Sequence, residues 1–173
     1  ISNNGGQMFV SNNALQTVYL DFDGEVTSYN GELLTIDNVI VEDSKITKAK
    51  IDEIVSTLNY QYTNRNVIFT TEKPVDSEYS TVYIGKTSSF EPYGNFAGLA
   101  ETIDIGNQNK SDKAFVMLDN TNSVENIVDV ISHEVDHLTG TLDHGGEGIN
   151  AYVAAGSIII SSGVTSSGLS TLY

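Results

Sequence analysis

The spacing of apolar residues between Asn122 and Gly140 predicts an amphipathic helix in the last third of the chain. Apolar side chains recur there at i, i+3, i+4 and i+7, which places them on one helical face. They are Val124, Ile127, Val128, Ile131, Val135 and Leu138. Asn122 is a candidate N-cap with Glu125 as its capping-box partner, and Gly140 is a candidate stop. This helix should therefore pack one face on a core and present the other face to a cleft.

Other segments predict a second helix and six strands. Residues 44–60 have helical periodicity, with Asp43 or Ser44 as the cap. Strand-like segments lie at residues 15–22, 33–41, 66–71, 80–85, 98–105 and 113–119, and residues 88–97 are expected to form a loop. This order of elements predicts an α+β fold with a mixed sheet. At 173 residues, the chain is expected to form a single domain.

Candidate chemistry is concentrated on the predicted C-terminal helix. All three histidines of the chain lie within residues 133–144, in the pattern HExxHxxGxxDH. His133 and His137 are four residues apart, so both imidazoles project from the same side of a helix and can bind one metal ion. Glu134 is then placed to act as the general base on a metal-bound water. The pattern therefore predicts a zinc hydrolase.

This pattern resembles the signature of the metzincin zinc endopeptidases, in its snapalysin-like version with Asp followed by His. The resemblance implies that His133 and His137 are zinc ligands, that Glu134 is the general base and that Asp143 is the third ligand. His144 remains an alternative third ligand, because imidazole is the commoner zinc ligand. The implied fold is a twisted mixed sheet with a backing helix and an active-site helix, followed by a small C-terminal subdomain. The upper subdomain would span about residues 10–140 and the lower about 141–173.

The chain departs from the metzincin pattern in two further respects. Asp136 stands where a small residue is common. The methionines are Met8 and Met117, so no methionine follows the motif to form the Met-turn that normally lies under the zinc. Tyr152, in the predicted lower subdomain, either lies near the metal or belongs to the core or surface.

The strand before the helix has a predicted role in substrate binding. In the family, an edge strand in this position pairs with the extended substrate, and here the candidates are Gly98, Leu99 and Ala100. The alternative is an ordinary internal strand. The expected substrate is a protein or peptide, hydrolysed by a zinc-activated water.

Composition narrows the possible partners and location. The chain has no cysteine. Its net charge is −15, and this negative charge makes nucleic acid and anionic membrane surfaces poor partners. No apolar run approaches the ~20 residues of a membrane span. We expect a secreted bacterial protein that acts as a monomer and from which any signal peptide has already been removed.

Two other functions are compatible with the sequence. The domain is alternatively a zinc-containing binding or adhesion module with little turnover. Residues 17–25, TVYLDFDGE, also resemble the first motif of haloacid-dehalogenase-type phosphatases, in which Asp21 and Asp23 would be catalytic with magnesium. The simpler interpretation of Asp23 and Gly24 is a turn that ends a strand.

Overall fold

Five strands form one mixed sheet in the computed structural model, which describes residues 14–32 and 34–141. Their order across the sheet is β4 (Val67–Thr70), β1 (Gln16–Asp21), β5 (Ser80–Ile84), β7 (Lys113–Val116) and β6 (Gly98–Ala100). The first four strands are parallel, whereas β6 runs antiparallel to β7 and forms one edge of the sheet. The predicted α+β class with a mixed sheet is confirmed.

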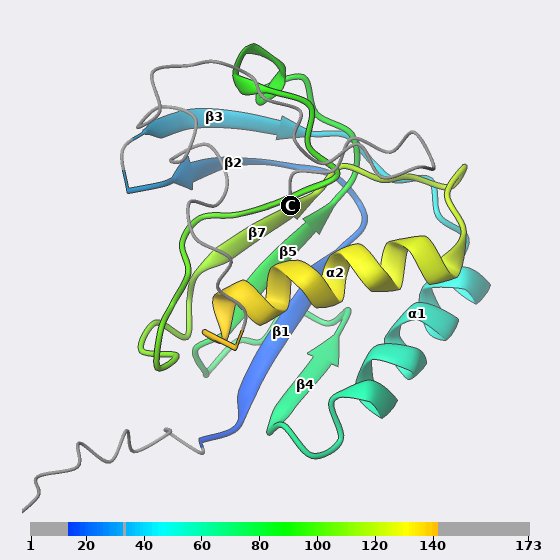
Figure 1. Ribbon diagram of the computed structural model, residues 1–173. Helices are drawn as coiled ribbons and strands as arrows, with labels where there is room; N and C mark the ends of the chain where they lie inside the picture. The colour runs from blue at the N-terminus through cyan, green and yellow to red at the C-terminus, as the bar shows by residue number, and fades with distance from the viewer. Residues whose placement is uncertain (1–13, 33, 142–173) are drawn as a thin grey trace, which may run out of the picture.

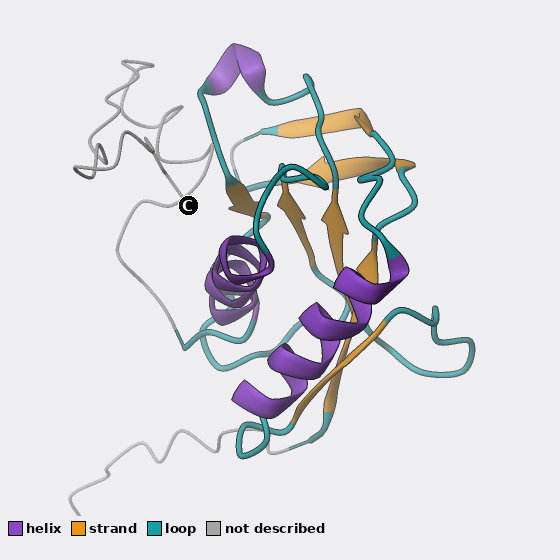
Figure 2. Cartoon of the chain, turned by 90° about the vertical axis from the view of Figure 1, so that its right-hand side faces the viewer, coloured by secondary structure: helices purple, strands orange, loops and turns teal. Residues whose placement is uncertain are grey.

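Two helices, α1 (Lys48–Gln61) and α2 (Val124–Leu138), lie on the same face of this sheet (Figures 1 and 2). Alternate strand residues such as Val82 and Ile84 point toward them, as the two-residue period of a strand requires. The apolar stripe predicted for the second helix is buried in this core. Its members Ile127, Val128, Ile131, Val135 and Leu138 are all at most 2% exposed.

A hairpin of β2 (Glu25–Asn30) and β3 (Thr35–Val41) covers part of the other face of the sheet. Tyr83 and Phe115 alternate with the helix-facing residues of their strands and so point toward the hairpin. They form a second cluster with Tyr29, Val39, Val41, Phe90, Phe96 and Leu99. The central strands are thus buried on both faces.

The N-caps of both helices differ from the predicted ones, and α1 begins later than predicted. The cap of α1 is Thr47, whose side chain accepts a hydrogen bond from the Lys50 amide, and not Asp43 or Ser44. The cap of α2 is Ser123, which accepts from the Asn126 amide. The Asn122 side chain instead accepts a hydrogen bond from the Asp119 amide, in the turn before the helix. Several polar residues near the start of a helix can act as its N-cap, and the conformation of the preceding turn determines which one does.

The strand predictions were correct in position but incomplete. The sequence did not predict β2, since its segment EVTSYN has few apolar residues. The segment predicted as a strand over 98–105 forms a strand, β6, only from Gly98 to Ala100. The side chain of the next residue, Glu101, accepts hydrogen bonds from the amides of Asn30 and Lys113. The loop predicted over 88–97 includes one short 3-10 helix, Glu91–Tyr93.

Part of the prediction falls beyond the residues just described. The proposed lower subdomain, including Asp143, His144 and Tyr152, lies outside the described residues. Within the described ranges, neither helix has the length and apolar character needed to cross a bilayer.

A buried polar network joins the starts of β1 and β5 to the loop before β7. The Gln16 side chain donates to Ser80 Oγ at 2.7 Å, and Ser80 Oγ donates to Asp112. Burial raises the pKa of Asp112 to about 7, although the Ser80 hydrogen bond opposes the shift. Folding therefore favours the protonated acid, so this carboxyl costs stability progressively as pH rises from about 4 to 7.

Replacing Asp112 by Asn should stabilise the protein more at pH 8 than at pH 5. The amide keeps the shape of the side chain without a buried charge, and the difference should be on the order of a few kcal/mol. Urea unfolding at the two pH values measures it. Asp129→Asn, an exposed change on α2, is the control and should have no such pH dependence. An equal effect of Asp112→Asn at both pH values would contradict this assignment.

Candidate metal and catalytic site

Three predicted site residues are brought together in the last two turns of α2. The rings of His133 and His137 have centroids 4.8 Å apart and lie nearly perpendicular, at 84°. Glu134 follows His133 on the adjacent side of the helix. Two imidazoles one turn apart, with a carboxylate beside them, are the arrangement that the HExxH spacing predicts.

The prediction that both histidines lie on an open helical face is wrong for His137. His133 is half-buried, but His137 is fully buried. The segment after β6 contacts this end of the helix, since the Asp104 amide donates to the His137 carbonyl at 3.1 Å. Periodicity identifies the most apolar face of a helix, but it does not reveal whether another segment also covers the polar face.

Glu134 is fully buried and packs against the edge strand. A Cβ atom added to Gly98 would lie 2.8 Å from both Cγ and Cδ of Glu134, so only glycine leaves room for this carboxyl group. Among the described residues, neither carboxyl oxygen has a partner in good hydrogen-bond geometry. A buried acid of this kind is costly unless a ligand, a metal or a proton compensates it.

Burial raises the pKa of Glu134 to about 8, and the nearby His137 and the Ala100 amide only partly oppose that shift. In the metal-free protein this carboxyl group is therefore mostly protonated at neutral pH. A cation beside it would favour the ionised form and lower the pKa. A metal ion held by the two imidazoles would therefore favour the ionised form of Glu134, which can act as a base.

The donor chemistry of α2 fits zinc. Two imidazoles at i and i+4 can act as zinc donors, and the buried Glu134 carboxyl lies beside them without a partner in good hydrogen-bond geometry within the described ranges. The described residues contain no group of three or more metal-binding side chains, so they offer two candidate donors and not a complete set. The third predicted ligand, Asp143 or His144, lies outside them.

The chain leaves α2 through a tight turn at Thr139 and Gly140. Thr139 ends the helix, and Gly140 adopts a left-handed conformation with φ of 69°. A Cβ at this position would lie 2.9 Å from the Ile105 Cα atom. Glycine is therefore required both by the backbone conformation and by close packing, as the predicted helix stop implied.

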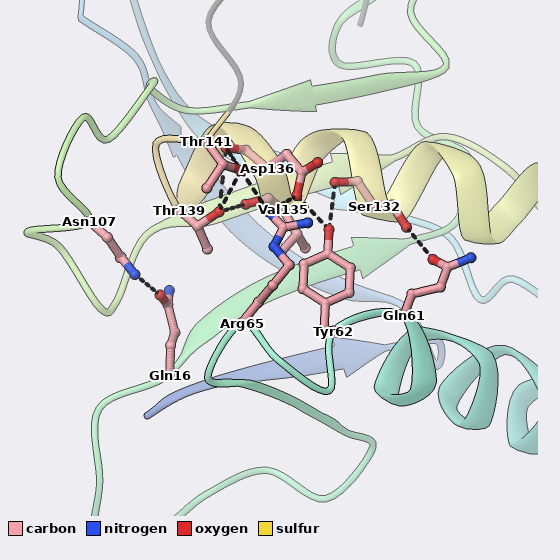
Figure 3. A network of polar contacts seen from close by, with 10 residues as sticks. All are labelled: Gln16, Gln61, Tyr62, Arg65, Asn107, Ser132, Val135, Asp136, Thr139 and Thr141. Atoms are coloured by element: carbon pink, nitrogen blue, oxygen red, sulfur yellow. Dashed lines mark hydrogen bonds and ion pairs between the residues drawn. The ribbon is translucent and has the colours of Figure 1, made fainter. Parts of the chain in front are cut away.

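Asp136 is tied to residues that the sequence gave no reason to select. Its carboxylate accepts from the Tyr62 hydroxyl at 2.6 Å and forms an ion pair with Arg65 at 2.7 Å (Figure 3). Both partners lie more than 70 positions earlier in the chain, at the end of α1 and just after it. No local sequence pattern could have revealed this pairing.

On one side of the edge strand β6, the backbone amides and carbonyls point away from the sheet. The Ala97 carbonyl and the Glu101 amide pair with β7. Since successive residues of a strand alternate in direction, the Ala100 amide points away from β7, and it lies near Glu134. Of the predicted substrate-binding residues, Gly98 and Leu99 are buried and Ala100 is half-buried.

The DFDG segment forms a turn between β1 and β2. The Asp23 amide donates to the Asp21 carboxylate at 3.1 Å, and Gly24 has φ of 86° with its Cα packed against the Asp43 backbone. Burial raises the pKa of Asp21, which is also hydrogen-bonded to Glu25. This geometry agrees with the simpler interpretation of the motif, a turn that ends a strand.

Comparisons with known proteins found no match to a family model, to a curated protein or to a solved structure.

Proposed function

We propose that this protein is a zinc-dependent endopeptidase, in which His133 and His137 bind the metal and Glu134 is the general base. The observation that supports this most strongly is the buried Glu134 carboxyl, held between a pair of imidazoles on α2 and the edge strand β6. Asp143 is the proposed third ligand, with His144 as the alternative. The metzincin-like motif supports the same assignment.

Bound zinc would supply an activated water and polarise the carbonyl of the scissile peptide bond. Glu134 takes a proton from the attacking water and delivers it to the leaving amine. Its position beside the two imidazoles suits this task, because zinc bound there would favour the ionised carboxylate, which can accept the proton. In the proposed complex, β6 holds the peptide in an extended form across the site.

Metal removal tests this proposal against its alternatives. Dialysis against a zinc chelator should abolish cleavage of unfolded casein, and one equivalent of zinc should restore it, whereas magnesium should not. Zinc binding without cleavage would favour a binding or adhesion module. Magnesium-dependent release of phosphate from a phosphomonoester would instead favour the phosphatase alternative at Asp21 and Asp23.

Ala100→Pro should lower kcat/KM for peptide cleavage by about tenfold or more, because it removes a main-chain donor that lies on the outer side of β6 beside Glu134. The β6–β7 pairing should survive, since this amide points away from β7. Zinc content should remain unchanged. Steady-state kinetics on a peptide substrate, together with metal analysis, measure both effects.

Ala100→Val is the matched control, since it changes the side chain and keeps the amide. It should retain more activity than the proline variant. Equal kinetics for Ala100→Pro and the native protein would rule out main-chain pairing of substrate at this position.

A further inference from the structure

The end of α2 is attached to the α1–β4 connection through Tyr62 and Arg65. Arg65 lies just after α1, and its guanidinium group contacts the Asp136 carboxylate at 2.7 Å. The same group lies 4.3 Å from the centre of the Tyr62 ring, which is buried and whose hydroxyl also bonds Asp136. A cation held by both a carboxylate and an aromatic face has a restricted position.

Arg65 also reaches beyond the end of the helix. Its Nη2 atom donates to Thr141 Oγ at 2.7 Å, while the Thr141 amide donates to the Asp136 carbonyl at 2.9 Å (Figure 3). Thr141 is therefore fixed through both its side chain and its backbone. It stands two positions before Asp143 in the sequence.

The same turn is held from its other side by the segment that follows β6. Gly140 packs against the backbone of Asp104 and Ile105, with no room for a Cβ atom. The Asp104 amide donates to the carbonyl of His137. The path out of the helix is thus set by contacts on two sides, one from Arg65 and one from the loop after β6.

We propose that Arg65 and Asp136 are positioning residues for the metal site, because they fix the end of α2 and the turn through Thr141, which lie in the sequence between His137 and the proposed third ligand. This inference rests on the proposed zinc site. The positioning role also accounts for Asp136, which stands where the metzincin motif commonly has a small residue. A side chain at this position can reach α1 and connect it to the turn.

The most selective test is Thr141→Val, which removes the acceptor for Arg65 and leaves the Arg65–Asp136 pair in place. Zinc affinity, measured by competition with a chromogenic chelator, should fall about tenfold, in the range known for residues that orient metal ligands. Arg65→Met should weaken binding at least as much. Adding Thr141→Val to Arg65→Met should then cause little further loss, because both changes break the same contact.

Two controls separate positioning from stability. Gln61→Ala removes a hydrogen bond between α1 and Ser132 but does not touch the turn, so its zinc affinity should equal that of the native protein. Arg65→Lys keeps the charge but loses the forked geometry, so it should restore only part of the affinity. Cobalt substitution adds a direct readout, because a displaced third ligand changes the visible spectrum of the bound ion.

The outcomes distinguish this inference from the proposed function. If the native protein binds no zinc, the proposed function fails and this inference fails with it. If the native protein binds zinc while Thr141→Val and Arg65→Met bind it within twofold of the native affinity, the zinc site stands and the positioning role is wrong. An equal loss of zinc affinity in Gln61→Ala would also contradict the positioning role, because it would reflect a general weakening of the packing between α1 and α2.

Discussion

Replacing Glu134 by Gln should reduce peptide cleavage by about 10²–10⁴-fold while zinc remains bound, since general acid–base catalysis typically contributes that much. Glutamine matches the size of the native side chain but cannot accept the proton. The metal ligands are untouched, so the loss should appear in kcat. Metal analysis and steady-state kinetics on the same preparation measure both properties.

The same variant has a second expected effect in the metal-free protein. Because burial raises the pKa of Glu134 to about 8, folding favours its protonated form, and the acid costs stability increasingly as pH rises from about 4.5 to 8. Glu134→Gln should therefore stabilise the metal-free protein at pH 8 and much less at pH 5. Glu125→Gln, an exposed change at the start of α2, is the matched control for both effects. Retained cleavage in Glu134→Gln would contradict the assignment of the base.

Gly98→Ala should lower kcat by about 100-fold with zinc still bound, an effect expected when a catalytic group moves by about 1 Å. The added Cβ would lie 2.8 Å from Cγ and Cδ of Glu134, which is too close for either atom to stay in place. The Glu134 side chain is flexible and can move away, so the fold should tolerate the change. Activity is therefore expected to fall much more than thermal stability.

Gly106→Ala is the matched control for this substitution. A Cβ there meets no heavy atom closer than 3.8 Å, although φ of 84° makes any side chain strained. It should lower stability by about 1–2 kcal/mol and leave kcat close to the native value. If Gly98→Ala has the same kcat as the native protein, Glu134 does not need its present position to act.

The features that depend on local periodicity were predictable from the sequence. The apolar stripe of α2 and the stop at Gly140 follow from residues within one helix and its ends, and the structure confirms both. The mixed sheet and the position of β6 ahead of α2 were also expected. The precise helix starts were not predictable, because Thr47 and Ser123 are each one of several nearby polar residues with a similar ability to cap a helix.

The features that depend on distant pairing were not predictable. Nothing near Asp136 indicates that it pairs with Arg65, which is 71 positions away. His137 is fully buried, although it lies on a helix face that its own sequence marks as polar. The contact between Gly98 and Glu134 likewise joins two segments whose proximity only the fold reveals.

The zinc content of the purified native protein is the measurement that bears most closely on the proposed metal site, with His137→Ala measured beside it. We expect about one zinc per native chain and a strongly reduced content in His137→Ala, since this substitution removes one of the proposed ligands. A native protein without bound zinc that also fails to take up added zinc would rule out the proposed site, as would an equal zinc content in both proteins.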